Sequence, residues 1–485
     1  MEISKYLILL MMVIYTFECF SVFGYHDAYT KMWILRRQSI WIFMIHFLAF
    51  LTLFLRMQEA RILVFYVIQV ALLGSIILLY GFLYPKVSRL VVNNMCMLLA
   101  VGFIMLTRLT YNNAVKQVII VAASGVISLF VPVIIRKARF LSRLKLVYAV
   151  VGVAALAAVI VVGRVSNGAM LGFEVAGISV QPSELVKIVF VFFVASSLYR
   201  AKDFRNVVIT TIVAALHVLI LVASTDLGAA LIVFVVYLVM LYVATRQPLY
   251  IAAGVGAGSV ASVAAYFLFS HVRTRVTVWR DPFAVYNEGG YQVAQSLFAI
   301  GTGGWFGLGL CQGLPDKIPV VTTDFIFSAI AEELGAVFAI CIILICVSCY
   351  IMFLNIAMQL RDSFYKLVAL GLGTCYIFQV FLAIGGVIKF IPSTGVTLPL
   401  VSYGGSSLLS TMIMFAIIQG LYILREDEEE DMERQRERQL RAKRRRQAQQ
   451  TGRPRSNGTR PSAGAPSGDR RRNSKNRNSQ RVRRP

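Results

Sequence analysis

The sequence predicts an all-α, polytopic membrane protein, and three observations support this fold class. The chain has 485 residues, of which 58% are hydrophobic and only 15% are charged. Its mean hydropathy is +0.71, whereas soluble domains contain about 45–50% apolar and about 25% charged residues. Apolar runs of about 20 residues, the length of a helix that spans a bilayer, follow one another along most of the chain.

At about twenty apolar residues per span, roughly thirteen transmembrane helices are expected. We place them at 6–24, 38–55, 62–84, 90–110, 115–135, 145–163, 185–199, 206–224, 227–245, 249–270, 324–354, 366–389 and 400–424. The first run has no basic region before it and no small-residue cleavage site after it, so we interpret it as a span rather than a signal peptide.

Basic residues concentrate in every second loop, that is, in loops on one side of the membrane, and this predicts the orientation of the chain. The linkers 136–145 and 200–205 are basic, and Arg246, Arg361 and Lys366 lie in further turns of the same side. Because Lys and Arg concentrate in cytoplasmic loops, we expect this side and the C-terminal tail in the cytoplasm. The formal net charge of +24 is therefore attributed to membrane topology, and no nucleic-acid partner is expected.

The tail after the last apolar run is highly charged. Residues 425–446 begin acidic and end basic, with Glu and Arg at helical spacing, so the last helix can extend into water. Residues 447–485 offer almost nothing to bury, which is typical of disordered chain. A purely solubilising tail and attraction to an anionic leaflet both fit this composition.

The longest polar stretch between apolar runs is 271–323, and charge parity places this large loop outside the cytoplasm. It contains Arg273, Arg275 and Lys317, and Asp324 follows where the next apolar run begins. Taken alone, Asp324 reads as a helix N-cap, because Asp is favoured there. In a wet loop among cations it is also a candidate general base.

Several polar groups lie inside apolar sequence, where they are expensive and mark packing or function. Glu184 and Lys187 are three residues apart, so they share a helix face, and Asp226 stands at another helix start. We expect these three residues to form structural ion pairs. Lys389, near a helix end, is explained equally well by snorkelling to the interface and by a functional role.

The segment 391–407 contains two Pro and several Gly and Ser, among them Ser402 and Ser406. Such a segment cannot form a plain helix. Irregular backbone at membrane depth is tolerated where it is buried in protein or lines a wet cavity. At about 100° per residue along one helix, Glu332 lies about 80° around the axis from Asp324, so we expect it to face the same cavity.

Other kinds of site find no support in the sequence. There is no Cys/His spacing for a metal, and the glycine-rich run 301–309 lacks the Gly-Lys-Ser/Thr of a phosphate-binding loop. What remains is a carboxylate among cations in a glycine-rich cleft. This suits transfer between substrates, because an incoming hydroxyl needs a base and a diphosphate leaving group needs cations.

Taken together, these motifs resemble the SEDS family, whose members include FtsW, RodA and SpoVE. The resemblance covers residues 90–424, and the motifs that carry it are Gly290-Tyr291-Gln292, Gln295-Ser296, Thr323-Asp324-Phe325-Ile326-Phe327, Glu332-Glu333-Leu334-Gly335, Gln181-Pro182-Ser183-Glu184, Asp226-Leu227-Gly228 and Pro392–Ser407. It implies a core of ten spans in 86–424. Residues 1–85 then supply three extra spans, and residues 425–485 the tail.

The resemblance also implies an activity, a peptidoglycan glycosyltransferase that polymerises lipid II outside the bacterial cytoplasmic membrane with a class B penicillin-binding protein. It assigns the general base to Asp324 and makes undecaprenyl diphosphate the leaving group, with Mg²⁺ or Mn²⁺ as the candidate cofactor. Substrate contacts are expected from Arg273, Arg275, Lys317, Gln292, Gln295, Ser296, Glu332, Ser402 and Ser406.

A flippase for the lipid-linked precursor is the alternative function. It would need a polar track through the bilayer midplane, whereas a carboxylate and cations gathered at one surface favour transfer. Division, elongation and sporulation stay open as cellular roles.

Overall fold

The computed structural model describes residues 2–162, 164–166, 169–175, 178–200 and 203–451. Eleven helices in this part of the chain are long and apolar enough to cross a membrane. They are α1 (Glu2–Gly24), α2 (Ala28–Met57), α3 (Ala60–Leu83), α4 (Arg89–Leu109), α5 (Tyr111–Lys137), α8 (Phe204–Ala223), α9 (Leu227–Thr245), α10 (Pro248–Leu268), α14 (Ala336–Gln359), α15 (Ser363–Val387) and α16 (Gly405–Thr451).

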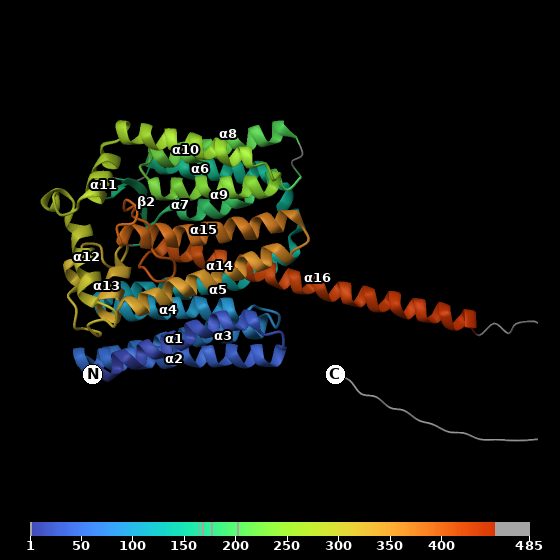
Figure 1. Cartoon of the computed structure of the whole chain (residues 1–485), viewed down its shortest axis with the longest axis horizontal. Helices are drawn as coiled ribbons and strands as arrows, with labels where there is room; N and C mark the ends of the chain where they lie inside the picture. The colour runs from blue at the N-terminus through green and yellow to red at the C-terminus, as the bar shows by residue number, and fades with distance from the viewer. Residues whose placement is uncertain (1, 163, 167–168, 176–177, 201–202, 452–485) are drawn as a thin grey trace, which may run out of the picture. The chain divides into compact units, whose positions relative to one another are not determined.

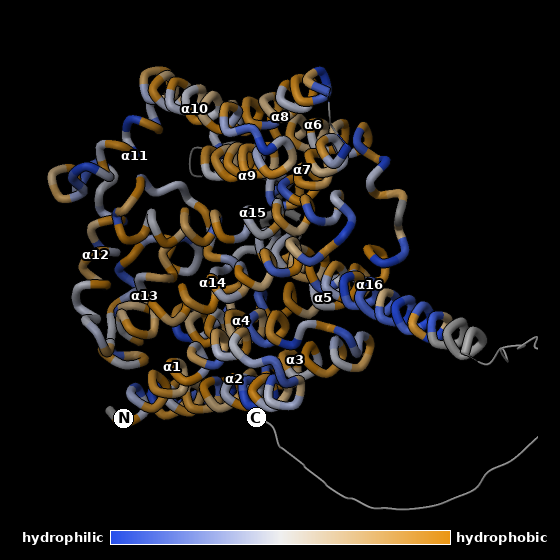
Figure 2. Tube along the Cα trace, turned by 45° about the vertical axis from the view of Figure 1, so that its right-hand side comes forward, coloured by the Kyte–Doolittle hydropathy of each residue, from blue (hydrophilic) through white to orange (hydrophobic). Residues whose placement is uncertain are grey.

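Two shorter helices occupy the two remaining expected spans, α6 (Lys145–Val162) and α7 (Pro182–Leu198). The prediction of an all-α, multi-pass membrane protein is therefore confirmed. Hydrophobic residues cover the bundle helices, and hydrophilic residues gather at helix ends and along the last part of α16 (Figure 2). Residues 1–429 form one compact unit, and a second unit begins at Glu430. The division at residues 85 and 424 stays a prediction.

One expected span, 324–354, is divided in the structure. A turn leads into α13 (Ile326–Leu334), and α14 starts after Gly335. Gly335 has φ 90° and ψ 164°, a conformation that L-residues rarely adopt. A Cβ at this position would lie 2.4 Å from the backbone nitrogen of Gly307. The break therefore requires glycine, both for its backbone conformation and for the close approach of the preceding loop.

The polar stretch 271–323 is largely helical rather than an open loop. It contains all but the first residue of α11 (Ser270–Arg280), the whole of α12 (Tyr291–Gly303) and two 3₁₀ turns, η2 (Tyr286–Glu288) and η3 (Pro315–Lys317). Figure 1 shows α11, α12 and α13 gathered at one end of the transmembrane helices, where α10 ends. This arrangement places the polar stretch over one mouth of the bundle.

A small antiparallel sheet lies between α6 and α7, which the expectation of pure helix did not include. Its strands β1 (Arg164–Ser166), β2 (Ala169–Val175) and β3 (Ile178–Val180) pair in the order β1-β2-β3. Strands of three to seven residues carry no signal in a search for apolar runs, because that search responds only to long segments.

The three N-terminal helices pack directly on the rest of the bundle. α1 contacts α2 and α14, and α2 contacts α4, which is buried along its whole hydrophobic length. Polar groups cross these interfaces: the Tyr15 hydroxyl donates to Asn94 Oδ1 at 2.8 Å, and the Asn94 amide donates to Ser348 Oγ at 3.4 Å. Helices α1–α3 therefore belong to the same packed unit as the core.

Candidate active site

A cavity of about 380 Å³ opens where α11 and α12 meet the turn before α13 and the segment after α15. Its wall includes the side chains of Arg275, Trp279, Gln292, Asp324, Lys389 and Ser393, together with glycines at 289, 386 and 395. Both charge signs are present in this small space. The cavity therefore has the composition of a polar binding site rather than of a packing defect.

Asp324 lies in the turn before α13 and is partly buried. The N-cap of α13 is Phe325, so Asp324 is not the helix cap that its sequence position suggested. Burial raises the pKa of the Asp324 carboxyl, while the charge of Arg275 and a hydrogen bond with Thr323 act in the opposite direction. A carboxylate that caps no helix and lines a cavity is available for chemistry.

Arg275 approaches the same place from α11. A Cβ built on Gly395 would lie 3.6 Å from Asp324 Oδ2 and 4.0 Å from Arg275 Nη2, so both charged groups lie beside this glycine. Arg275 Nη1 donates to the carbonyl of Ser393 at 3.2 Å. Burial lowers the pKa of Arg275, and the charges of Asp324 and Asp226 oppose that shift. The structure thus brings a cation and a carboxylate together, as the sequence suggested for these two residues.

The irregular segment 391–404 holds the turn that carries Asp324. The amide of Tyr403 donates to the carbonyl of Thr322 at 2.8 Å, and the Ser402 hydroxyl donates to the carbonyl of Thr323 at 2.5 Å. Ser402 Oγ also accepts from the amide of Leu398 at 3.0 Å. Ser402 therefore fixes backbone next to Asp324 and does not line the cavity, and Ser406 is buried at the start of α16.

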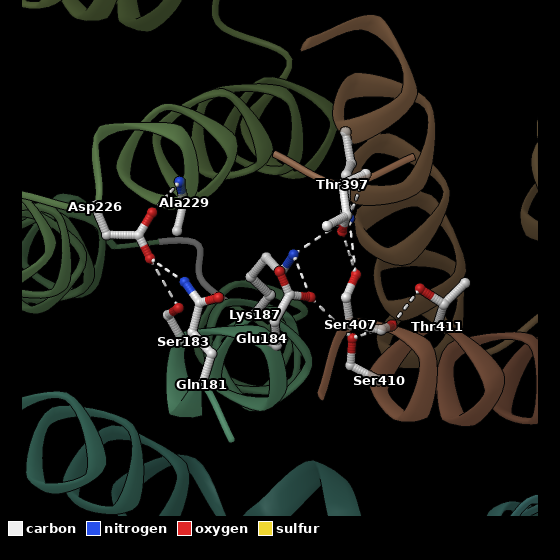
Figure 3. Close-up of polar contacts among 11 residues, drawn as sticks. Gln181, Ser183, Glu184, Lys187, Asp226, Ala229, Thr397, Ser407, Ser410 and Thr411 are labelled. Atoms are coloured by element: carbon white, nitrogen blue, oxygen red, sulfur yellow. Dashed lines mark hydrogen bonds and ion pairs between the residues drawn. The ribbon is translucent and has the colours of Figure 1, made fainter. Parts of the chain in front are cut away.

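A buried ion pair lies behind this segment (Figure 3). Lys187 Nζ is 2.9 Å from Glu184 Oε2 and donates to Gln379 Oε1 at 2.8 Å. The Gln379 amide in turn donates to the carbonyl of Thr397 at 3.2 Å and lies 3.4 Å from Ser407 Oγ. A continuous series of polar contacts therefore links the ion pair in α7 to Thr397 of the irregular segment, which contributes Ser393 and Gly395 to the cavity wall.

Asp226 forms a separate cluster, also visible in Figure 3. Its carboxylate accepts from Gln181 Nε2 at 2.9 Å, from Ser183 Oγ at 2.8 Å and from the amide of Ala229 at 3.0 Å. It is the N-cap of α9, and among the described residues it makes no ion pair with Lys187. The expected role of Asp226 as an ion-pair partner is thus replaced by helix capping.

Two of the expected cations lie outside the cavity. Arg273 is exposed on α11, and Lys317 is exposed in η3. Arg273 and Arg275 are two residues apart, which puts them about 200° apart around a helix, so only one of them can face the cavity. The sequence does not distinguish them, because it predicts a loop rather than a helix in this part of the chain.

Three further candidates are engaged in packing contacts. The Gln295 amide donates to the Tyr286 hydroxyl at 2.8 Å, whereas Gln292, one turn earlier on α12, does line the cavity. Ser296 is buried and bonds to Ser328 Oγ at 2.6 Å. Their hydrogen bonds join α12 to η2 and to α13.

Glu332, another expected substrate contact, is buried beneath the loop before η3. Its carboxylate accepts a hydrogen bond from the amide of Leu314 at 2.9 Å. Its expected position assumed a helix starting at Asp324. The turn that precedes α13 changes the angle, so Glu332 does not line the cavity. Its neighbour Glu333 faces away from Asp324, as helical spacing predicts, and pairs with Arg108 of α4 at 3.0 Å. The identity of this partner on another helix is what no local pattern could reveal.

One family model and several curated relatives match the sequence of this chain. The model of the FtsW/RodA/SpoVE family, described as cell cycle protein, matches residues 83–426. The chain is 38% identical over 271 residues to the peptidoglycan glycosyltransferase RodA of Mycobacterium tuberculosis, a match that covers 52% of this chain and 57% of that protein. It is 33% identical over 272 residues to the probable peptidoglycan glycosyltransferase FtsW of Tolumonas auensis, covering 54% of this chain and 71% of that protein. The chain thus spans little more than half the length of the RodA relatives it matches.

Two solved structures share the fold. One chain, from a study of structural coordination of polymerization and crosslinking by a peptidoglycan synthase complex, is 24% identical with a TM-score of 0.60, covering 70% of this chain and 98% of that chain. The crystal structure of rod shape determining protein RodA from Thermus thermophilus is 24% identical with a TM-score of 0.51, covering 69% and 96%. At this identity the likeness shows the fold alone. Because the family model extends over well more than half of its residues, this chain belongs to the FtsW/RodA/SpoVE family, the SEDS proteins.

Proposed function

We propose that this protein is a peptidoglycan glycosyltransferase that polymerises lipid II at the outer face of the bacterial cytoplasmic membrane. The observation that carries the proposal is the meeting of Asp324 and Arg275 in one polar cavity at a mouth of the bundle. The activities named for the RodA and FtsW relatives support the same reaction.

In the proposed step, the 4-hydroxyl oxygen of the acceptor sugar attacks the anomeric carbon of the donor. A new C–O bond forms from an electron pair of that oxygen, and the hydroxyl proton passes to the carboxylate of Asp324. The anomeric bond to the diphosphate breaks, and its electron pair leaves on undecaprenyl diphosphate. Because burial raises the pKa of Asp324, its carboxylate is a stronger base than that of an exposed aspartate.

The cavity is assigned to the extracytoplasmic side. α11–α13 lie at the end of the helices opposite to the turn between α14 and α15 (Figure 1). Arg361 lies in that turn and Lys366 at the start of α15, and such basic residues favour the cytoplasmic side. The C-terminal tail, residues 425–485, is assigned to the cytoplasm on the same argument.

A class B penicillin-binding protein is proposed as the partner. The chain of similar fold comes from a complex that coordinates polymerization with crosslinking. A polymerase that produces uncrosslinked strands has a chemical reason to associate with a transpeptidase.

A divalent cation, Mg²⁺ or Mn²⁺, stays a proposal for the cofactor. The described part of the chain contains no group of three or more His, Cys, Asp or Glu residues that could hold a metal. Of the carboxylates whose placement the structure describes, Asp324 alone lines the cavity. This donor set suits only an ion carried mainly by substrate phosphates, which is common for Mg²⁺.

A flippase is the less supported function. A polar track through the midplane would need free polar groups there, whereas Lys187 is bonded to both Glu184 and Gln379. The described charged groups that line an opening, Asp324, Arg275 and Lys389, are at the mouth instead.

The test is lipid II polymerisation by the purified protein with its penicillin-binding partner. We expect Asp324→Asn and Asp324→Ala to lower the rate by about 10²–10⁴-fold, the usual contribution of a general base. Glu288→Gln removes an exposed acid of the same stretch and should polymerise at the wild-type rate. Normal polymerisation by both Asp324 variants, with unchanged thermal unfolding, would contradict the assignment.

A further inference from the structure

Lys389 is a cation of the cavity that has no assigned task. It follows α15, lines the cavity with Arg275 and Asp324, and is partly buried. Among the described residues, no hydrogen-bond or ion-pair partner exists for its ammonium group. A partly buried ammonium group without a partner loses hydration that nothing in the protein replaces. An incoming anion would supply the missing interaction.

The backbone of Lys389 is held in an unfavourable conformation. Its φ is 60°, in the left-handed region that non-glycine residues rarely adopt. The Trp279 indole donates to the Lys389 carbonyl at 3.2 Å, and the amide of Phe390 donates to Gly385 at 2.8 Å. Trp279 lines the same cavity, so one of the two contacts that hold this conformation belongs to the cavity wall. Such strain is found preferentially at ligand-binding sites.

The charge of the cavity favours an anion. Among the side chains that the structure describes, Arg275 and Lys389 bring two positive charges to the wall, and Asp324, the one carboxylate there, brings one negative charge. A guanidinium group can bind phosphate oxygens with two parallel hydrogen bonds, and an ammonium group adds a compact charge. Arg273 and Lys317, the other cations proposed for this task, are exposed and lie outside the cavity.

We propose that Lys389 and Arg275 form the subsite that binds the diphosphate of a polyprenyl-linked sugar donor. This inference rests on the proposed function, and it names the side chains that receive the leaving group. Asp324 removes the proton from the acceptor on one side of the reacting carbon. The two cations stabilise the negative charge that develops on the diphosphate as the anomeric bond breaks.

The test measures binding of farnesyl diphosphate to the purified full-length protein in detergent by titration calorimetry. We expect Lys389→Gln to weaken binding about tenfold, as for loss of one hydrogen bond to a charged group. Lys389→Arg keeps the charge and should bind within about twofold of the wild type. Lys116→Gln, which removes an exposed lysine of α5, is the matched control and should bind as the wild type does. Farnesol, which has no phosphate, should bind equally to all four proteins.

The outcomes distinguish failure of the proposed subsite from failure of the proposed activity. Wild-type affinity of the folded Lys389→Gln variant for farnesyl diphosphate would overturn the subsite. Equal losses for farnesol and farnesyl diphosphate would overturn it as well, because the loss would then concern the prenyl chain. If binding depends on Lys389 but the wild type makes no glycan from lipid II with its partner, the subsite stands and the proposed activity fails.

Discussion

Asp324 is subject to two opposing influences on its proton affinity. Burial raises the pKa of its carboxyl, and the positive charge of Arg275 lowers it. A general base acts only when deprotonated, so the activity should fall as the pH falls through this raised pKa. The acid limb of the rate profile should therefore lie above the pH at which an exposed aspartate titrates, near a pKa of about 3.9.

Replacing Arg275 tests this electrostatic coupling. Arg275→Gln removes the charge that favours the ionised carboxylate, so the pKa of Asp324 rises further and the acid limb of kcat/KM moves to higher pH. Arg280→Gln removes an exposed arginine at the end of the same helix and should leave the limb in place. The measurement is polymerisation rate against pH at low substrate concentration. An unmoved limb in the Arg275 variant would show that another group titrates.

The sequence identified Asp324 and Arg275 but could not assign the residues around them. Choosing Arg275 over Arg273 requires knowing that α11 is a helix with one face toward the cavity. Lys389 lines the cavity from a residue with a left-handed φ, a conformation that no pattern of residue types predicts at this position. Local spacing gives neighbours along one helix, whereas this cavity is built by three segments within 274–325 and a fourth at 386–395.

At the scale of elements, close contact between α12 and α13 supports the turn that carries Asp324. A Cβ at Gly303 would lie 2.1 Å from the carbonyl oxygen of Ala331, so no side chain fits there. Gly301, on the same helix, has nothing within 4 Å of such a Cβ. Gly303→Ala should separate the two helices and lower the unfolding temperature and the polymerisation rate. Gly301→Ala should be neutral or stabilising by about 0.5–1 kcal/mol, the helix preference of Ala over Gly. Equal thermal unfolding of the two variants would contradict this packing.

The buried pair of Glu184 and Lys187 joins α7 to the cavity segment through Gln379. Glu184→Gln leaves a buried ammonium group without its counter-charge and should destabilise the protein by about 3–5 kcal/mol. Replacing both residues, by Glu184→Gln with Lys187→Met, removes the uncompensated charge and should cost less than the single change. Thermal unfolding in detergent measures both variants. A double variant that is less stable than Glu184→Gln would contradict the coupling.

Long elements were predictable because length and hydropathy define them, and each expected span contains a helix. The shorter features were not. The division at Gly335 depends on a contact with Gly307, more than twenty-five residues away in sequence. The sheet in 164–180 depends on pairing between strands that are individually too short to recognise.

At the scale of the whole molecule, the N-terminal helices cover the first helix of the family core. α4 is buried, and α2 and α3 both contact it. The start of α1 also reaches the loop between α12 and α13, since Lys5 Nζ donates to the carbonyl of Gly307 at 3.4 Å. Residues 1–85 therefore contribute to the packing of α4 and of the loop that meets Gly335.

Deletion of residues 1–85 should consequently lower the unfolding temperature of the remaining chain, because it exposes Asn94 and other polar groups of α4 to lipid. A separately expressed 1–85 fragment should bind the truncated chain and restore its stability, since the interface exists without a covalent link. Deletion of residues 452–485, outside the described fold, is the control and should leave unfolding unchanged. If the chain without residues 1–85 unfolds at the wild-type temperature, α4 does not depend on this cover. The N-terminal helices would then have to act on something other than the stability of the core.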